Sequence, residues 1–161
     1  MNILNNLIEL KKNIPKNVEL VAVSKTKTKE LILEAYNAGQ RHFGENKIQE
    51  MVEKWKLLPK DIKWHMIGHV QTNKVKYMAP FVYKIHGVDS IKLMKEIQKQ
   101  ALKNHRTIQC LLQINISNEK SKFGIKETEL NTLINAAYSF PNLKIKGLMG
   151  MASFTSNPDL I

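Results

Sequence analysis

Cysteine is almost absent from this sequence of 161 residues, since Cys110 is the only one. A single thiol excludes an internal disulfide framework and is typical of a reducing compartment, so we expect a cytoplasmic protein. No apolar run approaches the roughly 18 residues of a membrane-spanning helix, and we expect no signal peptide and no membrane partner. The 43% of hydrophobic residues are spread along the whole length, which predicts one domain with a core and excludes a disordered tail.

Arginine is nearly as scarce as cysteine. Only Arg41 and Arg106 stand among 25 basic residues, although the formal net charge is +11. Proteins that read nucleic acids usually use arginine, whose planar fork pairs with guanine or phosphate. The lysines are scattered, so we interpret them as a solvated surface and expect no specific nucleic-acid partner. The alternative, a nucleic-acid-binding face, would show a steep salt dependence of binding. The positive field would still attract anionic ligands such as phosphate esters.

Motifs of several common site classes are also missing. The sequence has no Walker loop, no dinucleotide fingerprint after its first apolar run and no nucleophile elbow, so ATP hydrolysis and Rossmann-type redox chemistry lack support. His65 and His69 stand four residues apart, a spacing that would bring two metal ligands together on a helix. Their segment has the pattern of a strand, and no cysteine or carboxylate is spaced to complete a set, so we expect no metal site.

The sequence does contain a regular alternation of apolar runs and amphipathic segments. The run 18–23 is nearly continuous and predicts a strand buried on both faces. Capping and stop residues such as Ser90 and Gly39 delimit helices. The other predicted strands are 41–44, 63–67, 82–86, 107–116 and 143–149, and the predicted helices are 1–13, 28–38, 46–57, 73–78, 90–103 and 127–139. This alternation predicts an α/β fold with a parallel sheet and crossover helices.

About six strand–helix units are compatible with two architectures. One is a doubly wound open sheet, and the other is a (β/α)8 TIM-type barrel of which only part is present, because a typical barrel needs roughly 250 residues. The pattern by itself leaves both open. In either case ligands bind at the carboxyl ends of the strands, which directs attention to the residues that follow each apolar run.

Lys25 follows the first apolar run directly. A lysine at the mouth of an apolar pocket can form a Schiff base with an aldehyde, but the same residue can simply begin a solvated loop. After the second run, Asn46 can hydrogen-bond a ligand heteroatom or serve as a turn and helix cap. In 147–151, Met149 can pack on a flat cofactor ring or belong to the ordinary core. His86 is interpreted as a hydrogen-bonded residue at a strand end.

Taken together, these segments resemble one family. Two of the blocks are Val-Ala-Val-Ser-Lys-Thr at 21–26 and Phe-Gly-Glu-Asn at 43–46, which is followed by 49–50. The other blocks, in the order in which the family has them, are 35–39, 64–74, 85–89, 113–117 with 121–124, and 147–149. Their order and content are similar to the pyridoxal-phosphate homeostasis proteins, which share the barrel fold of the alanine racemase N-terminal domain. The resemblance extends over nearly the whole chain, so it favours the barrel over the doubly wound sheet.

The resemblance implies a protein that binds pyridoxal 5′-phosphate (PLP) as an internal aldimine on Lys25. It places Asn46 at a ligand-side position and makes His65 and Met149 pocket-lining residues. It implies no catalytic residues and no turnover, but a role in PLP homeostasis, with PLP-dependent apoenzymes as further partners. The alternative is an amino-acid racemase-like enzyme of fold-type III, which would also need a catalytic base from a second domain.

The sequence departs from this family at its C-terminal end. Family members continue for about two more strand–helix units of the (β/α)8 barrel, and these carry the phosphate-binding loop. We therefore expect residues 1–161 to form a single, partial PLP-binding barrel domain. The missing units would come from a complementing second chain, or the chain would be a non-functional truncated remnant.

Overall fold

The computed structural model describes residues 3–117, 123–152 and 156–157. Residues 121–122, which belong to one of the family-like blocks, lie outside this part of the chain. The strands are β1 (Ala22–Val23), β2 (His42–Glu45), β3 (Lys63–Met66), β4 (Lys84–Val88), β5 (Ile108–Ile114) and β6 (Leu143–Gly150). The helices are α1 (Ile3–Asn13), α2 (Lys29–Asn37), α3 (Ile48–Leu57), α4 (Val75–Met78), α5 (Ile91–Lys103) and α6 (Leu130–Ala137), with short 3-10 turns at Thr72–Lys74 and Glu127–Glu129.

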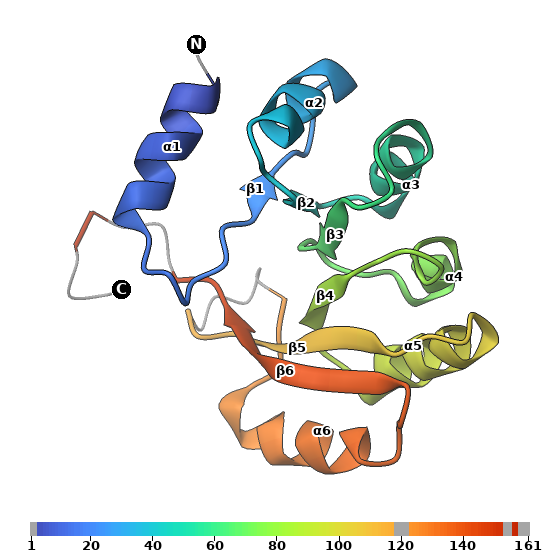
Figure 1. Cartoon of the computed structure of the whole chain (residues 1–161). Helices are drawn as coiled ribbons and strands as arrows, with labels where there is room; N and C mark the ends of the chain where they lie inside the picture. The colour runs from blue at the N-terminus through green and yellow to red at the C-terminus, as the bar shows by residue number, and fades with distance from the viewer. Residues whose placement is uncertain (1–2, 118–122, 153–155, 158–161) are drawn as a thin grey trace.

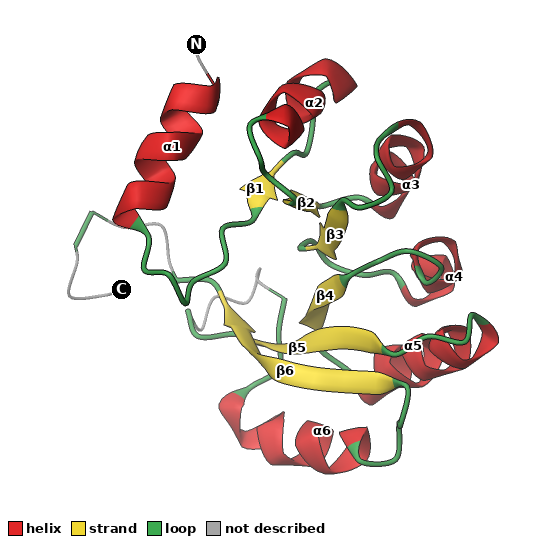
Figure 2. Cartoon of the chain, in the orientation of Figure 1, coloured by secondary structure: helices red, strands yellow, loops and turns green. Residues whose placement is uncertain are grey.

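The six strands form one parallel sheet in the order β1-β2-β3-β4-β5-β6, so every strand pairs with its neighbours in sequence. A doubly wound sheet reverses its strand order at a switch point and carries helices on both faces. Here the order never reverses, and the crossover helices α2 to α6 lie outside an arc of strands (Figures 1 and 2). The topology therefore confirms the partial barrel and rejects the doubly wound sheet.

The hydrophobic core lies between the outer face of the sheet and these helices. Phe43, Trp64 and Ile85 are fully buried strand residues that pack in one cluster with helix residues such as Met51 and Ile97. Each fully buried side chain of this size contributes roughly 1.5–3 kcal/mol. Because successive residues of a strand point to opposite faces, the residues next to these, such as His42 and His65, face the inside of the arc.

The first strand is where the sequence prediction was wrong. A strand over 18–23 buried on both faces was expected, but β1 has two residues, and Val18 and Val23 are 53% and 52% exposed. The reason is that β1 is an edge of the sheet, so only one neighbour pairs with it. The other edge is β6, whose side chains beyond Leu143 alternate between half-buried and exposed. The remaining predicted elements are present, with their ends displaced by a few residues.

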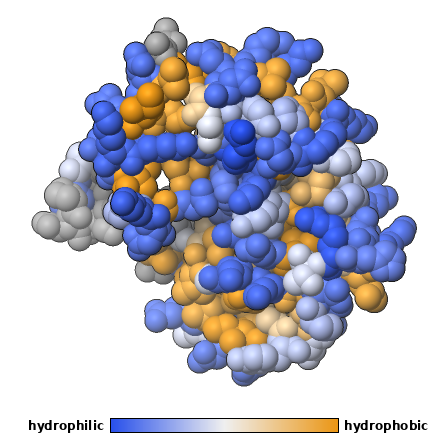
Figure 3. Space-filling view, in the orientation of Figure 1, coloured by the Kyte–Doolittle hydropathy of each residue, from blue (hydrophilic) through white to orange (hydrophobic). Residues whose placement is uncertain are grey.

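The surface is mixed, with hydrophilic side chains around smaller apolar areas (Figure 3). Some of the apolar side chains belong to α1, where Leu4, Ile8 and Leu10 are each more than 40% exposed. Among the described residues, no helix combines the length and apolar character that a membrane crossing requires.

Candidate functional site

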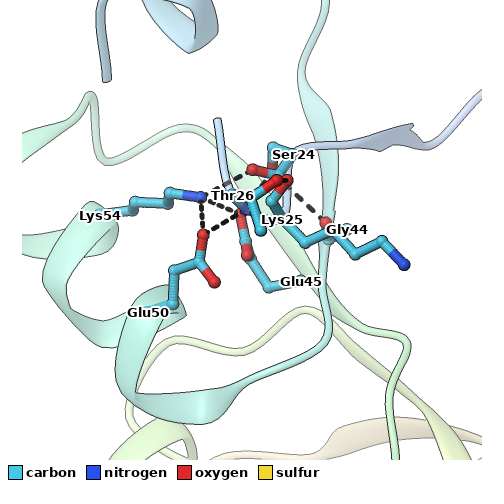
Figure 4. A network of polar contacts seen from close by, with 7 residues as sticks. All are labelled: Ser24, Lys25, Thr26, Gly44, Glu45, Glu50 and Lys54. Atoms are coloured by element: carbon cyan, nitrogen blue, oxygen red, sulfur yellow. Dashed lines mark hydrogen bonds and ion pairs between the residues drawn. The ribbon is translucent and has the colours of Figure 1, made fainter. Parts of the chain in front are cut away.

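Lys25 lies just beyond the carboxyl end of β1. The Ser24 amide donates to the Gly44 carbonyl oxygen at 2.9 Å, so the β1–β2 pairing continues one residue past the strand. The Lys25 side chain is exposed and makes no hydrogen bond or ion pair with the part of the chain that the structure describes. It extends past Gly44, away from the polar network that holds its neighbours (Figure 4). Its amine is therefore accessible to a ligand at this end of the sheet.

The neighbours of Lys25 belong to a network that we call the Lys54 clamp, defined as Ser24, Thr26, Glu45, Glu50 and Lys54 (Figure 4). The Ser24 hydroxyl donates to Glu45 Oε1 at 2.6 Å. The Lys54 ammonium donates to the Ser24 carbonyl oxygen, to Glu45 Oε1 and to Glu50 Oε1, at 2.7, 2.7 and 2.6 Å. The Thr26 amide donates to Glu50 Oε1 at 2.6 Å. The chain on both sides of Lys25 is thereby joined to β2 and α3.

The Lys54 clamp holds three charged side chains, those of Glu45, Glu50 and Lys54, between α3 and the sheet. Glu45 is 0% exposed, and burial raises the pKa of its carboxyl, although hydrogen bonds from Lys54 and Ser24 oppose that rise. Glu50 is less buried, and the hydrogen bond from Lys54 holds the pKa of its carboxyl below the usual value. Glu45 Oε2 has no hydrogen-bond partner among the described residues. The arrangement therefore depends on the Lys54 ammonium to offset two carboxyl groups.

Sequence reasoning did not single out Lys54. Its signal was present, because Glu50 and Lys54 stand four residues apart on α3, the spacing at which a glutamate and a lysine pair on a helix. That spacing is common on exposed helix faces. Only the structure shows that this pair faces the sheet, with the Lys54 side chain 10% exposed.

Asn46 follows β2 directly and is half-buried. Val23 pairs with Gly44 in parallel neighbouring strands, and Lys25 and Asn46 each follow two residues later, so both lie past the same end of the sheet. Asn46 also lines a cleft of about 400 Å³ with His69, Gln71 and other polar residues, and Lys25 is not among the lining residues. The fold thus brings Lys25 and Asn46 to one end of the sheet.

His65 lies inside the arc in a chain of three histidines, one from each of β2, β3 and β4. Its Nε2 is 2.9 Å from Nδ1 of His42, and its Nδ1 is 2.8 Å from Nε2 of His86. Both ring nitrogens of His65 therefore already have partners, and its side chain is 1% exposed. A direct contact of this ring with a cofactor stays a prediction. The fold places His65 in the sheet interior, behind the strand ends where Lys25 and Asn46 lie.

The histidine chain has one direction and is neutral. His42 Nε2 lies 3.3 Å from Glu19 Oε2, an acceptor, so Nε2 carries the proton and Nδ1 accepts from His65 Nε2. By the same logic His86 donates from Nε2 to His65 Nδ1. Burial lowers the pKa of His65 to about 3 and that of His86 to about 4, and it lowers the pKa of His42 as well.

Met149 lies on β6 and pairs in register with Gln113 of β5. Gln113 is buried and donates from Nε2 to the Phe123 carbonyl oxygen at 3.1 Å. Met149 and Lys25 belong to the two opposite edges of the sheet, so they flank its open side rather than stand on adjacent strands. Within the described ranges, no group of three or more histidine, cysteine or acidic side chains could hold a metal ion.

Comparison with known proteins places this arrangement in a family. The model of the alanine racemase N-terminal domain matches residues 1–160. The pyridoxal phosphate homeostasis protein of Aquifex aeolicus is 39% identical over 142 residues, which are 88% of this chain and 62% of that protein. The protein of the same name from Vibrio cholerae is 41% identical over 140 residues, 84% of this chain and 59% of its own length. The chain thus spans about three fifths of the curated relatives it matches.

Solved structures agree with this assignment. PipY from Synechococcus elongatus without PLP has a TM-score of 0.91 and 33% identity, covering 96% of this chain and 73% of PipY. PipY with PLP bound has a TM-score of 0.87 at the same 33% identity, covering 95% and 72%. Alanine racemase from Bartonella henselae, at 19% identity, covers 98% of this chain and 45% of the racemase with a TM-score of 0.76, and shares the fold. The chain therefore belongs to the alanine racemase N-terminal domain family, and within it the chain is similar to the pyridoxal phosphate homeostasis proteins.

Proposed function

We propose that this chain binds PLP through Lys25 and takes part in intracellular PLP homeostasis, holding the cofactor without turning over a substrate. The observation that carries the proposal is the state of Lys25. Its side chain is exposed and without a described partner, whereas the residues on both sides are held by β2 and α3. The 33% identity to PipY, whose structure was solved with PLP bound, supports PLP as the ligand.

The chemistry proposed for Lys25 is the formation of a Schiff base. The ammonium first loses a proton to solvent, and the neutral Nζ then attacks the aldehyde carbon of PLP. A C=N bond forms, and the aldehyde oxygen leaves as water. No oxidant or reductant is needed. Lys25 fits this role because its amine is free of ion pairs with the described residues and lies at the carboxyl end of a strand, where barrel ligands bind.

Three further residues belong to the proposed site. Asn46 follows β2 as Lys25 follows β1, at the same end of two neighbouring strands, and would donate or accept a hydrogen bond at the ring. His65 would act from the interior, through its histidine partners rather than through a free nitrogen. Met149, on β6 at the open side of the sheet, would pack against the ring face.

The two sheet edges suggest how the rest of the cofactor is held. β1 and β6 each pair with one strand only, and Val23 and Leu148 on these strands are half exposed. Unpaired edges of a parallel sheet favour further pairing. We propose that about two more strand–helix units close the barrel here and supply the phosphate-binding groups, in the same polypeptide or in a complementing chain. Cytoplasmic PLP-dependent apoenzymes are the proposed recipients of the cofactor.

The test is a comparison of wild type with Lys25→Ala and Lys27→Ala. Both variants lose one exposed lysine from the same loop, so they have equal net charge. With added PLP, we expect a visible absorbance band in wild type and Lys27→Ala, and a covalent mass increment on Lys25 after borohydride reduction. Lys25→Ala should show neither. A band of equal strength in Lys25→Ala would contradict the proposal, and racemisation of alanine by the purified chain would contradict the non-enzymatic part.

A further inference from the structure

We propose that Lys54 is a positioning residue for Lys25, acting through the Lys54 clamp. This inference rests on the proposed function, because it concerns the lysine that would react with the cofactor. Lys54 lies on α3, its side chain is 10% exposed, and its ammonium reaches the main chain beside Lys25, whereas the Lys25 side chain extends away from it (Figure 4). Its effect would therefore be exerted through the backbone on either side of Lys25.

The first step of the argument is the use of the Lys54 ammonium. A lysine ammonium has three protons to donate. Here one acceptor is a main-chain oxygen, the Ser24 carbonyl at 2.7 Å, and the other two are Glu45 Oε1 and Glu50 Oε1. The Ser24 carbonyl belongs to the peptide bond that enters Lys25. Lys54 thus fixes the orientation of that peptide and joins it to α3.

The second step concerns the peptide that leaves Lys25. Its N–H belongs to Thr26 and donates to Glu50 Oε1 at 2.6 Å, the same oxygen that Lys54 holds. Thr26 has a φ of 62°, in the left-handed region that β-branched residues rarely adopt. Such a conformation persists only where the surroundings impose it. The contact with Glu50 is one such constraint, beside the hydrogen bond from the Lys27 amide to the Ser24 carbonyl oxygen at 3.0 Å. The clamp therefore contributes to holding the turn after Lys25.

The third step is the contrast between main chain and side chain. Both peptide bonds of Lys25 are held by charged partners, while its side chain has four carbon atoms and no described partner. Reaction at Nζ needs the amine directed at one point, and a displacement of about 1 Å can cost roughly 100-fold in an aligned reaction. A rigid backbone with a free side chain meets this need, since only the side-chain torsions remain to be ordered.

The experiment uses Glu50→Ala and Glu50→Gln as a matched pair in the full chain. Both remove one negative charge from the first turn of α3, but only glutamine keeps an oxygen that can accept from Thr26 and Lys54. Total PLP bound is measured by ultrafiltration, and covalent attachment to Lys25 by borohydride reduction and mass spectrometry. We expect the covalent share of bound PLP to fall roughly tenfold in Glu50→Ala and to recover to within about twofold of wild type in Glu50→Gln.

Two further measurements separate positioning from loss of structure. Amide hydrogen exchange at Thr26, without PLP, should quicken in Glu50→Ala and not in Glu50→Gln. Lys54→Met should lower the covalent share at temperatures where circular dichroism shows it folded. An unchanged covalent share in Glu50→Ala overturns the positioning role, and so does a fall in covalent and total binding in parallel. Wild type without any covalent adduct overturns the proposed function itself.

Discussion

Two buried polar clusters lie on opposite faces of the sheet, and β2 contributes Glu45 to one and His42 to the other. The two clusters accommodate burial differently. On the outer face, the Lys54 clamp keeps its charge and offsets it with ion pairs at 2.6 and 2.7 Å. On the inner face, the histidine chain is neutral, because burial lowers the pKa of His65 to about 3. A charged cluster fails when one member is lost, whereas a neutral one fails when a proton is forced onto it.

The largest effect that would test this contrast is expected for Lys54→Met. Removing the cation leaves the Glu45 and Glu50 carboxyl groups facing each other without an ammonium between them. It also takes one of two donors from the Ser24 carbonyl oxygen, which keeps the Lys27 amide at 3.0 Å. Breaking a buried pair in this way costs roughly 3–5 kcal/mol of the free energy of unfolding. Urea denaturation measures it, with Lys56→Met, an exposed lysine of the same helix, as the control expected within about 0.5 kcal/mol of wild type. Equal midpoints for the two variants would show that the clamp adds nothing to stability.

The intermediate effect is the response of the histidine chain to acid. The unfolded chain protonates histidine near pH 6.5, whereas folded His65 and His86 stay neutral down to about pH 3 and 4. Between these limits the unfolded state binds more protons, so stability falls as the pH falls. The slope is about 1.4 kcal/mol per pH unit for each proton taken up only on unfolding. Denaturation at a series of pH values between 7 and 4 measures it.

A control variant sharpens the acid experiment. His65→Asn should reduce the slope, because one buried histidine is gone from the chain. His105→Asn should leave the slope unchanged, since His105 is exposed and its φ of 51° suits asparagine. Identical slopes for wild type and His65→Asn would mean that the histidine chain is not the source of acid sensitivity.

The smallest effect is expected at the end of the histidine chain. Among the described residues, Glu19 is the charged contact of His42 that favours a proton at Nε2, and its side chain is 63% exposed. Glu19→Ala should cost at most about 1 kcal/mol of stability. It should nevertheless alter the tautomer balance of His42, which nitrogen-15 chemical shifts of the ring report. Unchanged ring shifts would show that the direction of the chain is set elsewhere, for example by Tyr83, whose ring meets His42 edge-on at 5.4 Å.

Much of the fold was predictable because it depends on local patterns. The alternation of apolar runs with amphipathic segments gave five of the strands nearly in place, since buried parallel strands need continuous apolar residues. The strand at 18–23 was misjudged for the same reason, because an apolar run looks alike in the centre and at the edge of a sheet. Strand order decided between barrel and doubly wound sheet, and order depends on contacts between segments far apart in the chain.

The candidate site was also predictable only in part, and the predictable part again depends on local patterns. Lys25 and Asn46 follow apolar runs directly, so the rule that ligands bind at strand ends was sufficient to select them as candidates. Lys54 was not found, because a lysine four residues after a glutamate is usually an exposed helix pair. His65 was expected to line a pocket, but its two nitrogens are occupied by His42 and His86, residues 23 and 21 positions away.

The sequence by itself determined the elements, the lysine at the end of the first strand and the family, because each depends on residues that are neighbours in the chain. The tertiary structure alone decided which of those residues act together. In the folded chain, α3 is oriented so that Lys54 faces Ser24, which stands 30 residues earlier. The strands β2, β3 and β4 lie side by side, so their histidines form one chain. Such contacts arise from packing between distant segments, and no local pattern specifies them.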